Sequence, residues 1–374
     1  MKKILKMILG IIATIIGLTV LIGVIFITTS KEFGAKPKGA DLKRIALSEN
    51  YKMGKFLNPT ETNVDGNINY WKTLREYFTT GNKVPDWSIP VNKISAAEIS
   101  ALPDTITKVT WFGHSTLLLE MDGKKIFIDP MLGDVPAPHP LLGSKRFNDT
   151  LPLAIEDIPQ LDAVIISHDH YDHLDYGSIK KLKDKVGHFY VPLGVGSHLK
   201  SWGITEVKIT EMDWWQTTNV GGIQLTAAPA RHFSGRGLTD RMKTQWSSWV
   251  IKGKKDNIYF SGDSGYGNHF KKIGDTYGPF DLAIMECGQY DEQWPLIHMM
   301  PEQTVQATID ANAKLMLPIH WGAFKLSLHS WQDPIERVTT AAHGKDIKVT
   351  TPIIGEPVII GSRAPNATWW VKNK

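Results

Sequence analysis

The chain has one cysteine, Cys287, among its 374 residues. A lone cysteine excludes an intramolecular disulfide, and no cysteine stands near the N-terminus to carry a lipid. A strong charge of one sign is also missing, because the net charge is +4 and the lysines and arginines are spread along the chain. This spread argues against a basic groove for phosphates, so no nucleic-acid partner is expected.

Charged residues are absent from 7–29, an isoleucine-rich run near the N-terminus. At about 1.5 Å per residue, a helix of this length crosses a hydrocarbon core of about 30 Å. The alternative is a cleaved signal peptide, but its apolar region spans only about 7–15 residues and needs a small-residue cleavage site. We therefore expect residues 1–30 to form a retained single-pass membrane anchor, with the lipid bilayer as a partner. Lysines stand on both sides of the run, so charge does not choose the side of the membrane.

The sequence pattern divides the rest of the chain into an extension at 31–104, a main domain at 105–362 and a C-terminal tail at 363–374. In the extension, Ile68, Trp71, Leu74 and Phe78 recur at helical spacing and form one apolar face. We expect this face to pack against the main domain. The alternative is that it lies on the bilayer surface.

Short strands separated by turns dominate the main domain. Residues 163–167 form an almost continuous apolar run, which is typical of a buried central strand. Strands outnumber helices and both occur in each half, which favours two sheets with helices outside, an α/β layered sandwich. The strands are predicted at 108–112, 116–121, 125–128, 163–167, 188–191, 206–209, 223–228, 247–251, 257–260, 282–286, 314–318 and 356–360, and the helices at 176–183, 302–312 and 334–343.

Four side chains of the kinds that bind metals fall within six residues: His168, His170, Asp172 and His173. They follow the buried strand and precede a helix, so they lie on a loop that can turn several of them to one point. Imidazole and carboxylate are usual zinc ligands. The alternative, a polar turn with surface histidines, does not explain why such residues recur elsewhere in the same setting.

That setting recurs three times, at His232, Asp263 and His320, each of which follows a predicted strand. Ligands at strand ends along one edge of a fold converge even when they are far apart in sequence. Gly262 and Gly265 flank the aspartate, and we expect them to allow a tight backbone there rather than to contact a substrate.

In order and spacing, the H-x-H-x-D-H run, His232, Asp263 and His320 resemble the signature of the metallo-β-lactamase superfamily. Within it, seven further segments resemble the N-acyl-phosphatidylethanolamine-hydrolysing phospholipase D group. They are the Trp-Phe-Gly-His-Ser-Thr run at 111–116 and those at 127–130, 145–147, 245–249, 278–282, 298–302 and 320–324. The likeness covers roughly residues 105–340.

The resemblance implies a fold, the αββα four-layer sandwich, and a dinuclear metal centre. One Zn²⁺ would be held by His168, His170 and His232. The second would be held by Asp172, His173 and His320, and Asp263 would bridge the two. Other divalent transition metals suit the same donors.

Two metals about 3.5–4 Å apart activate a water near neutral pH and neutralise charge on a phosphoryl group. The catalytic residues implied are Asp172, to orient the nucleophile, Asp263, and His298, to supply the leaving group with a proton. A structural role is the alternative for His298, and we favour one for His114. Asp129 either holds a ligand imidazole or caps a turn before Pro130.

The function expected is that of a dinuclear-zinc phosphodiesterase of phospholipase D type, acting on N-acyl-phosphatidylethanolamine-like phospholipids. The alternatives are a lactonase or a sugar-phosphate hydrolase of the same superfamily, and a non-catalytic membrane protein with structural metals. Structural zinc is usually closed by four protein ligands, whereas seven ligands for two ions leave room for water. The sequence does not determine the oligomeric state, and a homodimer is one of the states it allows.

Overall fold

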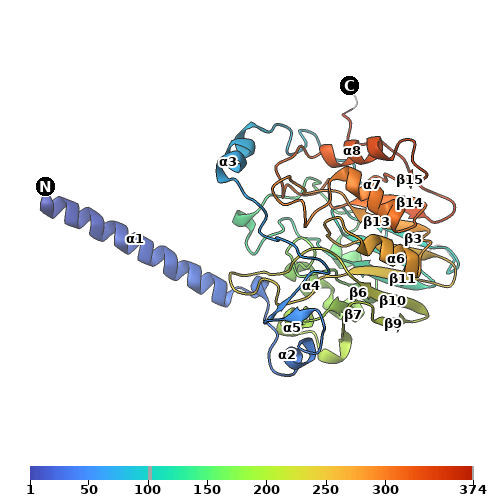
Figure 1. Ribbon diagram of the computed structural model, residues 1–374, viewed down its shortest axis with the longest axis horizontal. Coiled ribbons are helices and arrows are strands. Elements are labelled where there is room, and N and C mark those ends of the chain that lie inside the picture. The colour runs from blue at the N-terminus through green and yellow to red at the C-terminus, as the bar shows by residue number, and fades with distance from the viewer. Residues whose placement is uncertain (100–102, 373–374) are drawn as a thin grey trace.

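The computed structural model describes residues 1–99 and 103–372. Residues 100–102, in the predicted extension, and 373–374, at the end of the predicted tail, lie outside the described residues. The main domain is built on two seven-stranded sheets that lie face to face (Figure 1). Beyond them, the extension forms a small hairpin of β1 (Tyr51–Lys52) and β2 (Lys55–Phe56).

The first sheet has the order β16-β3-β4-β5-β6-β7-β8. Its strands β5 to β8 are parallel, so their carboxyl ends share one edge. The strands are β3 (Lys108–Trp111), β4 (Leu117–Met121), β5 (Lys124–Ile128), β6 (Leu161–Ile165), β7 (Val186–Pro192), β8 (Ile209–Met212) and β16 (Pro357–Ile359).

The second sheet has the order β15-β14-β13-β12-β11-β10-β9, and β12 to β15 are parallel. The strands are β9 (Thr217–Val220), β10 (Ile223–Ala228), β11 (Ser248–Lys252), β12 (Asn257–Phe260), β13 (Leu282–Glu286), β14 (Leu315–Ile319) and β15 (Lys348–Val349).

Helices cover the outer face of each sheet. Ile179 of α4 (Tyr176–Leu182) and Leu199 of α5 (Gly196–Ser201) are buried with Phe127 and Phe189 on the outer side of the first sheet. The second sheet is covered by α6 (His269–Tyr277), α7 (Pro301–Asp310) and α8 (Asp333–Ala342). The main core lies between the sheets. The predicted four-layer αββα sandwich is therefore confirmed.

Strands β10, β12 and β13 have the predicted bounds, because each is an apolar run between clear turns. The strand predicted at 206–209 is wrong in its first three residues, which form a 3-10 helix, and β8 begins only at its last. Strands β9 and β15 and helices α5 and α6 were not predicted. β9 and β15 lie at the sheet edge and carry polar residues, so apolar alternation does not mark them.

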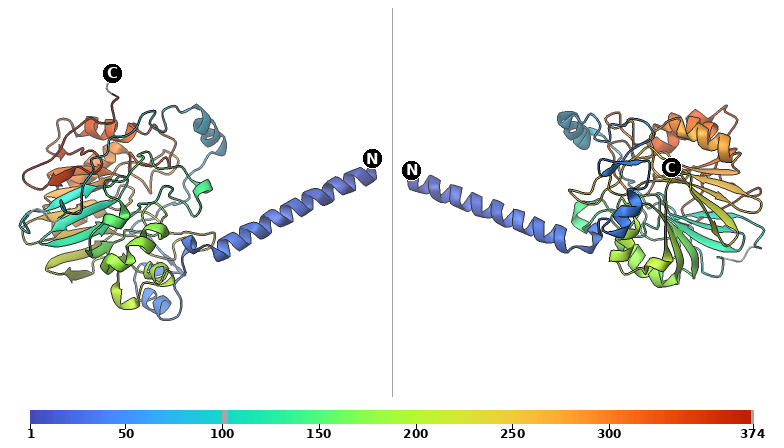
Figure 2. Two further views of the ribbon diagram at one scale, coloured as in Figure 1. Left: turned by 180° about the vertical axis from the view of Figure 1, so that it is seen from behind. Right: turned by 60° about the horizontal axis from the view of Figure 1, so that its bottom comes forward.

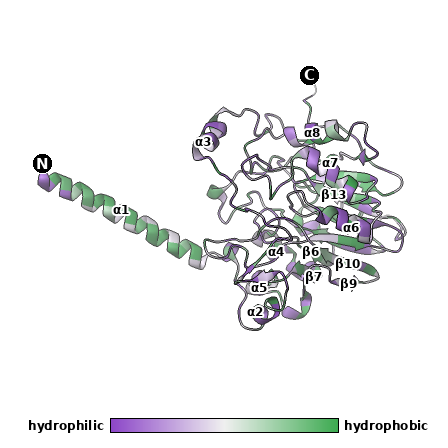
Figure 3. Cartoon of the chain, in the orientation of Figure 1, coloured by the Kyte–Doolittle hydropathy of each residue, from purple (hydrophilic) through white to green (hydrophobic). Residues whose placement is uncertain are grey.

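Among the described residues, one helix, α1 (Lys2–Thr29), has the length and apolar composition needed to cross a membrane. It projects away from the domain and carries apolar residues on all sides (Figure 3). A signal sequence would have the same features, so α1 is a candidate membrane span.

The carboxyl end of α1 is fixed to the domain beside the ligand-rich loop. Trp202 Nε1 donates a hydrogen bond to the carbonyl of Lys31, and Arg236 Nε donates to that of Glu32, both at 2.8 Å. Phe33 then meets the ring of Tyr171 edge-on, with 6.4 Å between centroids. Tyr171 stands between two predicted ligands, so α1 leads directly to the predicted metal site.

The extension is joined to the domain by an apolar cluster. Ile45 and Phe56 are buried there with Trp214 and Trp246 of the main domain. The helix α3 (Tyr70–Thr79) behaves differently: Trp71 is 82% exposed and Phe78 is 76% exposed. The expectation that this face packs against the main domain is wrong for Trp71, Leu74 and Phe78, because the polar side of α3 makes the contacts. Ile68, which precedes α3, does lie beside main-domain residues. The domain limits at 105 and 362 remain predictions.

Replacing Phe56 with alanine is expected to lower the free energy of unfolding by about 3 kcal/mol, because the buried ring would leave a cavity. Chemical denaturation of the full chain in detergent measures this. The control is Leu47→Ala at an exposed site, expected within about 0.5 kcal/mol of wild type. Equal midpoints for the two variants would show that the extension unfolds separately from the domain.

Tryptophan supplies much of the core next to the predicted site. Trp111 and Trp321 stack with 5.8 Å between ring centroids, and Trp369 stacks on Trp321 at 5.0 Å. The predicted C-terminal tail is thus packed into the domain through Trp369 and Trp370. The chain has 13 tryptophans, and those named here serve the core rather than contact with lipid.

Candidate metal centre

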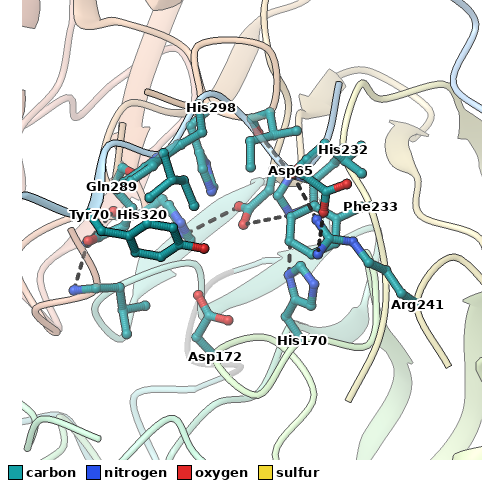
Figure 4. A pocket seen from close by; sticks show the side chains of 16 residues that line it. Asp65, Tyr70, His170, Asp172, His232, Phe233, Arg241, Gln289, His298 and His320 are labelled. Carbon is teal, nitrogen blue, oxygen red and sulfur yellow. Dashed lines mark hydrogen bonds and ion pairs between the residues drawn. The ribbon is translucent and has the colours of Figure 1, made fainter. Parts of the chain in front are cut away.

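All seven predicted ligands come together at one edge of the sandwich. Figure 4 shows four of them, His170, Asp172, His232 and His320, around the cavity. The reason is topological: each follows the carboxyl end of a strand, and the two sheets bring those ends face to face. The residues are His168, His170, Asp172 and His173 after β6, His232 after β10, Asp263 after β12 and His320 after β14.

One group of donor atoms consists of three imidazoles. His170 Nδ1 lies 2.9 Å from His168 Nε2 and 3.2 Å from His232 Nε2. All three side chains offer a nitrogen within 4.8 Å of the others. Three converging neutral nitrogens are a common protein contribution to a zinc site with one open position.

A second group contains Asp172, His173 and His320, with His114 beside them. Asp263 lies between the two groups: its Oδ2 is 3.0 Å from His173 Nε2 and 3.8 Å from His168 Nε2. Its other oxygen, Oδ1, is 3.3 Å from His320 Nδ1. One carboxylate therefore faces both groups, as a bridging ligand must.

Several residues hold the imidazoles in place from behind. Asp129 accepts hydrogen bonds from the Ser167 backbone N–H at 2.7 Å and from His173 Nδ1 at 2.8 Å. This settles the alternatives for Asp129 in favour of orienting an imidazole. Ser115 Oγ is hydrogen-bonded to His320 Nδ1 at 3.0 Å, a contact that the sequence did not predict.

His114 was expected to have a structural role, but it contacts one of the predicted ligands directly. It is fully buried, and its Nε2 lies 2.8 Å from Asp172 Oδ2. The ring also lies over His320, with 4.1 Å between centroids. His114 therefore fixes the orientation of Asp172, which is one of the predicted ligands.

The backbone around the centre is unusual. His114, Asp129 and His320 all have left-handed φ values, of 53°, 43° and 66°. Strained residues of this kind persist where the surroundings fix them and gather at functional sites. Gly262 has φ 55°, and a Cβ on Gly265 would lie 2.0 Å from the Leu296 carbonyl oxygen. Both glycines thus allow a tight backbone beside Asp263, as predicted.

Burial sets the protonation of the centre. Loss of water lowers the pKa of three of its imidazoles well below the usual range, which leaves them neutral. His173 differs, because the carboxylates of Asp263 and Asp172 outweigh its burial and hold its pKa well above that range. Burial also raises the pKa of Asp263 to about 6. These three imidazoles belong to His168, His232 and His320, and burial lowers the pKa of His170 as well, to about 4.

The donor set fits a pair of divalent metal ions. Within the described residues, two buried atoms of the centre, His173 Nε2 and Asp263 Oδ1, have no hydrogen-bond partner. Buried polar atoms without partners are costly, and a bound cation would satisfy both. The four neutral imidazoles, those of His168, His170, His232 and His320, likewise offer the form that binds metal.

The centre forms the floor of a cavity of about 630 Å³. Part of its wall comes from the extension, which sequence analysis did not connect with the site. Arg241 stands at the same wall, where its guanidinium lies over the Phe233 ring and pairs with Asp65 at 3.1 Å. The residues that the extension contributes are Val64, Asp65, Ile68 and Tyr70.

Asn58 ties the extension to one of the predicted ligands. Its side-chain amide donates to the His232 carbonyl at 2.8 Å and accepts from the His232 N–H at 3.0 Å. Trp246 Nε1 donates to the same Asn58 oxygen at 3.2 Å. The extension is therefore part of the structure that positions His232.

His298 lies in the cavity wall, as its predicted catalytic role requires. Its ring stacks on His320 with 5.2 Å between centroids. Behind it, Glu286 Oε2 lies 3.8 Å from His298 Nδ1, and burial raises the pKa of Glu286 well above its usual range. His298 also offers a nitrogen within 4.8 Å of donor atoms of His232 and Asp263. Proton donor and metal ligand are thus both geometrically allowed.

Asp129→Ala is expected to weaken zinc binding about 10- to 100-fold, because His173 loses the carboxylate that orients it. Competition with a chromogenic chelator measures the affinity. Asp162→Ala is the control, since Asp162 accepts a hydrogen bond from Lys125 at the opposite end of β6. Equal zinc affinity in the two variants would contradict the role assigned to Asp129.

Comparison with known proteins agrees with this geometry. The Beta-lactamase superfamily domain matches residues 124–321, more than half of the chain. The chain belongs to the metallo-β-lactamase superfamily. The match spans β5 to the residue after His320 and so includes all seven predicted ligands.

Two relatives extend the likeness beyond this domain of the metallo-β-lactamase superfamily. An uncharacterised protein of Mycobacterium tuberculosis is 37% identical over 89% of this chain and 91% of its own. The N-acyl-phosphatidylethanolamine-hydrolysing phospholipase D 1 of Caenorhabditis elegans is 32% identical over 76% of this chain and 84% of its own.

A solved structure agrees in fold. It is a possible metal-dependent hydrolase of Veillonella parvula, with a TM-score of 0.54 and 18% identity, covering 68% of this chain and 99% of that one. The protein is thus a metal-dependent hydrolase of the metallo-β-lactamase superfamily with homologues of the phospholipase D type.

Proposed function

We propose that the protein is a dinuclear-zinc phosphodiesterase of phospholipase D type that acts on N-acyl-phosphatidylethanolamine-like phospholipids. One zinc is assigned to His168, His170 and His232, and the other to Asp172, His173 and His320. Asp263 is assigned as the bridging ligand. When bound, the metals would supply a nucleophile from water near neutral pH and offset phosphoryl charge.

The composition of the cavity is the observation that carries this proposal. Its floor is made of donors for cations, which suits an anionic phosphodiester. Its walls include Ile68, Phe233, Trp294 and Leu326, which suit acyl chains. A lactone carries no negative charge that would need these donors. A sugar phosphate has no acyl chain to bind to the four apolar side chains of the wall.

The chain's own residues divide the remaining tasks. His114 holds Asp172 in place within the second group of donors, where the carboxylate would orient the attacking water. His298 is placed to give a proton to the departing alkoxide. Arg241, at the cavity wall, supplies a positive charge that can bind the phosphate or another polar part of the lipid headgroup.

The test is hydrolysis of N-acyl-phosphatidylethanolamine by the full chain, zinc-loaded and in detergent. We expect phosphatidic acid and N-acylethanolamine as products. In ¹⁸O-labelled water, attack at phosphorus places the label in the phosphatidic acid. Turnover of a lactone panel without phosphodiester cleavage would refute the proposal.

Metal analysis of the same preparation tests the centre separately. We expect about two zinc ions per chain. A value of one or none after zinc loading would contradict the dinuclear assignment. Removal of zinc with a chelator should abolish hydrolysis, and added zinc should restore it.

A further inference from the structure

The helix α3 is amphipathic, but it is mounted with its apolar side outward. Its aromatic and aliphatic residues share one side and are between 50% and 82% exposed, which is costly in water. A helix on a soluble domain normally turns this side to the core. We call the exposed set the α3 face; it consists of Tyr70, Trp71, Leu74, Tyr77 and Phe78.

Polar contacts hold α3 in this orientation. Thr73 Oγ1 donates a hydrogen bond to Gln293 Oε1 at 3.2 Å, and the Asn69 N–H donates to the same oxygen at 2.8 Å. Lys72 Nζ pairs with Glu292 at 3.3 Å. The side of α3 that binds the domain is therefore the polar one, so the outward aromatic side is a fixed feature of the fold.

A second exposed apolar segment lies beside α1. Leu141 is 86% exposed and Leu142 is 63% exposed, in a 3-10 helix at Pro140–Leu142. The ring of His139 contacts Phe26 of α1, with 6.0 Å between centroids. This pair of leucines thus stands where the candidate membrane span meets the domain.

α3 and α1 lie on the same side of the domain in all three views (Figures 1 and 2). The cavity opens on that side too, because Ile68 and Tyr70, at the start of α3, line it. An apolar span, two exposed apolar segments and the cavity mouth are therefore neighbours on one surface.

We propose that the α3 face, together with Leu141 and Leu142, is a docking surface for the lipid bilayer that holds the cavity mouth against the membrane. Tyrosine and tryptophan are favoured at the interface between acyl chains and headgroups. Lys325 flanks Tyr77, with its Nζ atom 4.8 Å from the ring centre, where its charge can meet a lipid phosphate. This surface goes beyond the proposed reaction, since it concerns binding to lipid whatever the substrate.

Nitroxide labels on the full chain in phosphatidylcholine–phosphatidylglycerol vesicles test this surface. Labels are placed at Trp71→Cys and Leu142→Cys. The control is Lys345→Cys, at an exposed site between α8 and β15, two elements that lie on the side of the domain away from α1 (Figure 1). The native Cys287 is buried and stays unlabelled. We expect labels at 71 and 142 to collide with oxygen, which concentrates in lipid, and the label at 345 to collide with an aqueous nickel chelate.

Two results would overturn the proposal. Nickel collisions at position 71 equal to those at 345 would place the α3 face in water. If the label at position 71 is shielded from both oxygen and the nickel chelate and shows dipolar broadening from a second label, the α3 face is a contact between two copies of the chain.

A kinetic arm of the test rests on the proposed function. Trp71→Ser combined with Phe78→Ser should lower hydrolysis of vesicle phospholipid roughly tenfold. Hydrolysis of a soluble short-chain analogue should not change, because neither side chain lines the cavity. Val207→Ser, an exposed valine in a 3-10 helix, is the control. Equal losses on both substrates would count against docking, whereas no turnover by any variant would refute the reaction and leave the label result standing.

Discussion

Asp263→Asn is expected to lower phosphodiester hydrolysis by roughly 10³-fold or more, because loss of metal chemistry removes several kcal/mol of transition-state stabilisation. The amide keeps the shape of the carboxylate but removes the charge that faces both donor groups. Bound zinc should fall below two ions per chain. Steady-state kinetics and elemental analysis of one preparation measure both effects.

Asp184→Asn is the matched control for that substitution. Asp184 is exposed in a 3-10 helix at Lys183–Lys185, away from the cavity. It should keep wild-type zinc content and rate. An Asp263→Asn protein with full zinc and wild-type turnover would exclude Asp263 as a ligand.

His298→Gln is expected to lower kcat about 10²- to 10⁴-fold on the natural type of substrate, the range lost with a general acid. The zinc content should stay unchanged if His298 donates a proton to the leaving alkoxide. A phosphodiester with a p-nitrophenolate leaving group needs no such proton, so its hydrolysis should fall far less. Comparing the two substrates separates proton donation from other roles.

The competing role for His298 gives a different pattern. As a metal ligand with His232 and Asp263, its loss would reduce zinc content and slow both substrates alike. His269→Gln is a control, since this buried histidine bonds Ser264 behind the centre and does not line the cavity. It should leave the ratio of the two rates unchanged.

The sequence revealed the donor set because the chemistry is local. Four donors fall within six residues, and each remaining donor follows an apolar run recognisable as a strand. Strand ends meet at one edge of a layered sandwich, so the fold class alone brings such residues together. The two facing sheets were predictable for the same reason.

Contacts across long stretches of chain were not predictable. Asn58 and His232 are separated by 174 positions, and nothing in the local pattern marks an asparagine that binds both backbone groups of a distant histidine. The prediction of which side of α3 faces the domain was wrong for a related reason. Periodicity identifies the apolar side of a helix, but which side the domain covers depends on partners such as Gln293, far along the chain.

The bonds of Asn58 to His232 have a consequence for how this protein can be divided. The two-sheet fold begins only with β3, at Lys108, so the segment before it could be taken for a dispensable leader. Yet a chain shortened to that fold would lose the amide that fixes His232 and also the Val64 to Tyr70 wall of the cavity. We therefore expect substrate range to depend in part on residues outside the matched domain, so that grafting a relative's N-terminal segment alters selectivity without changing a single ligand.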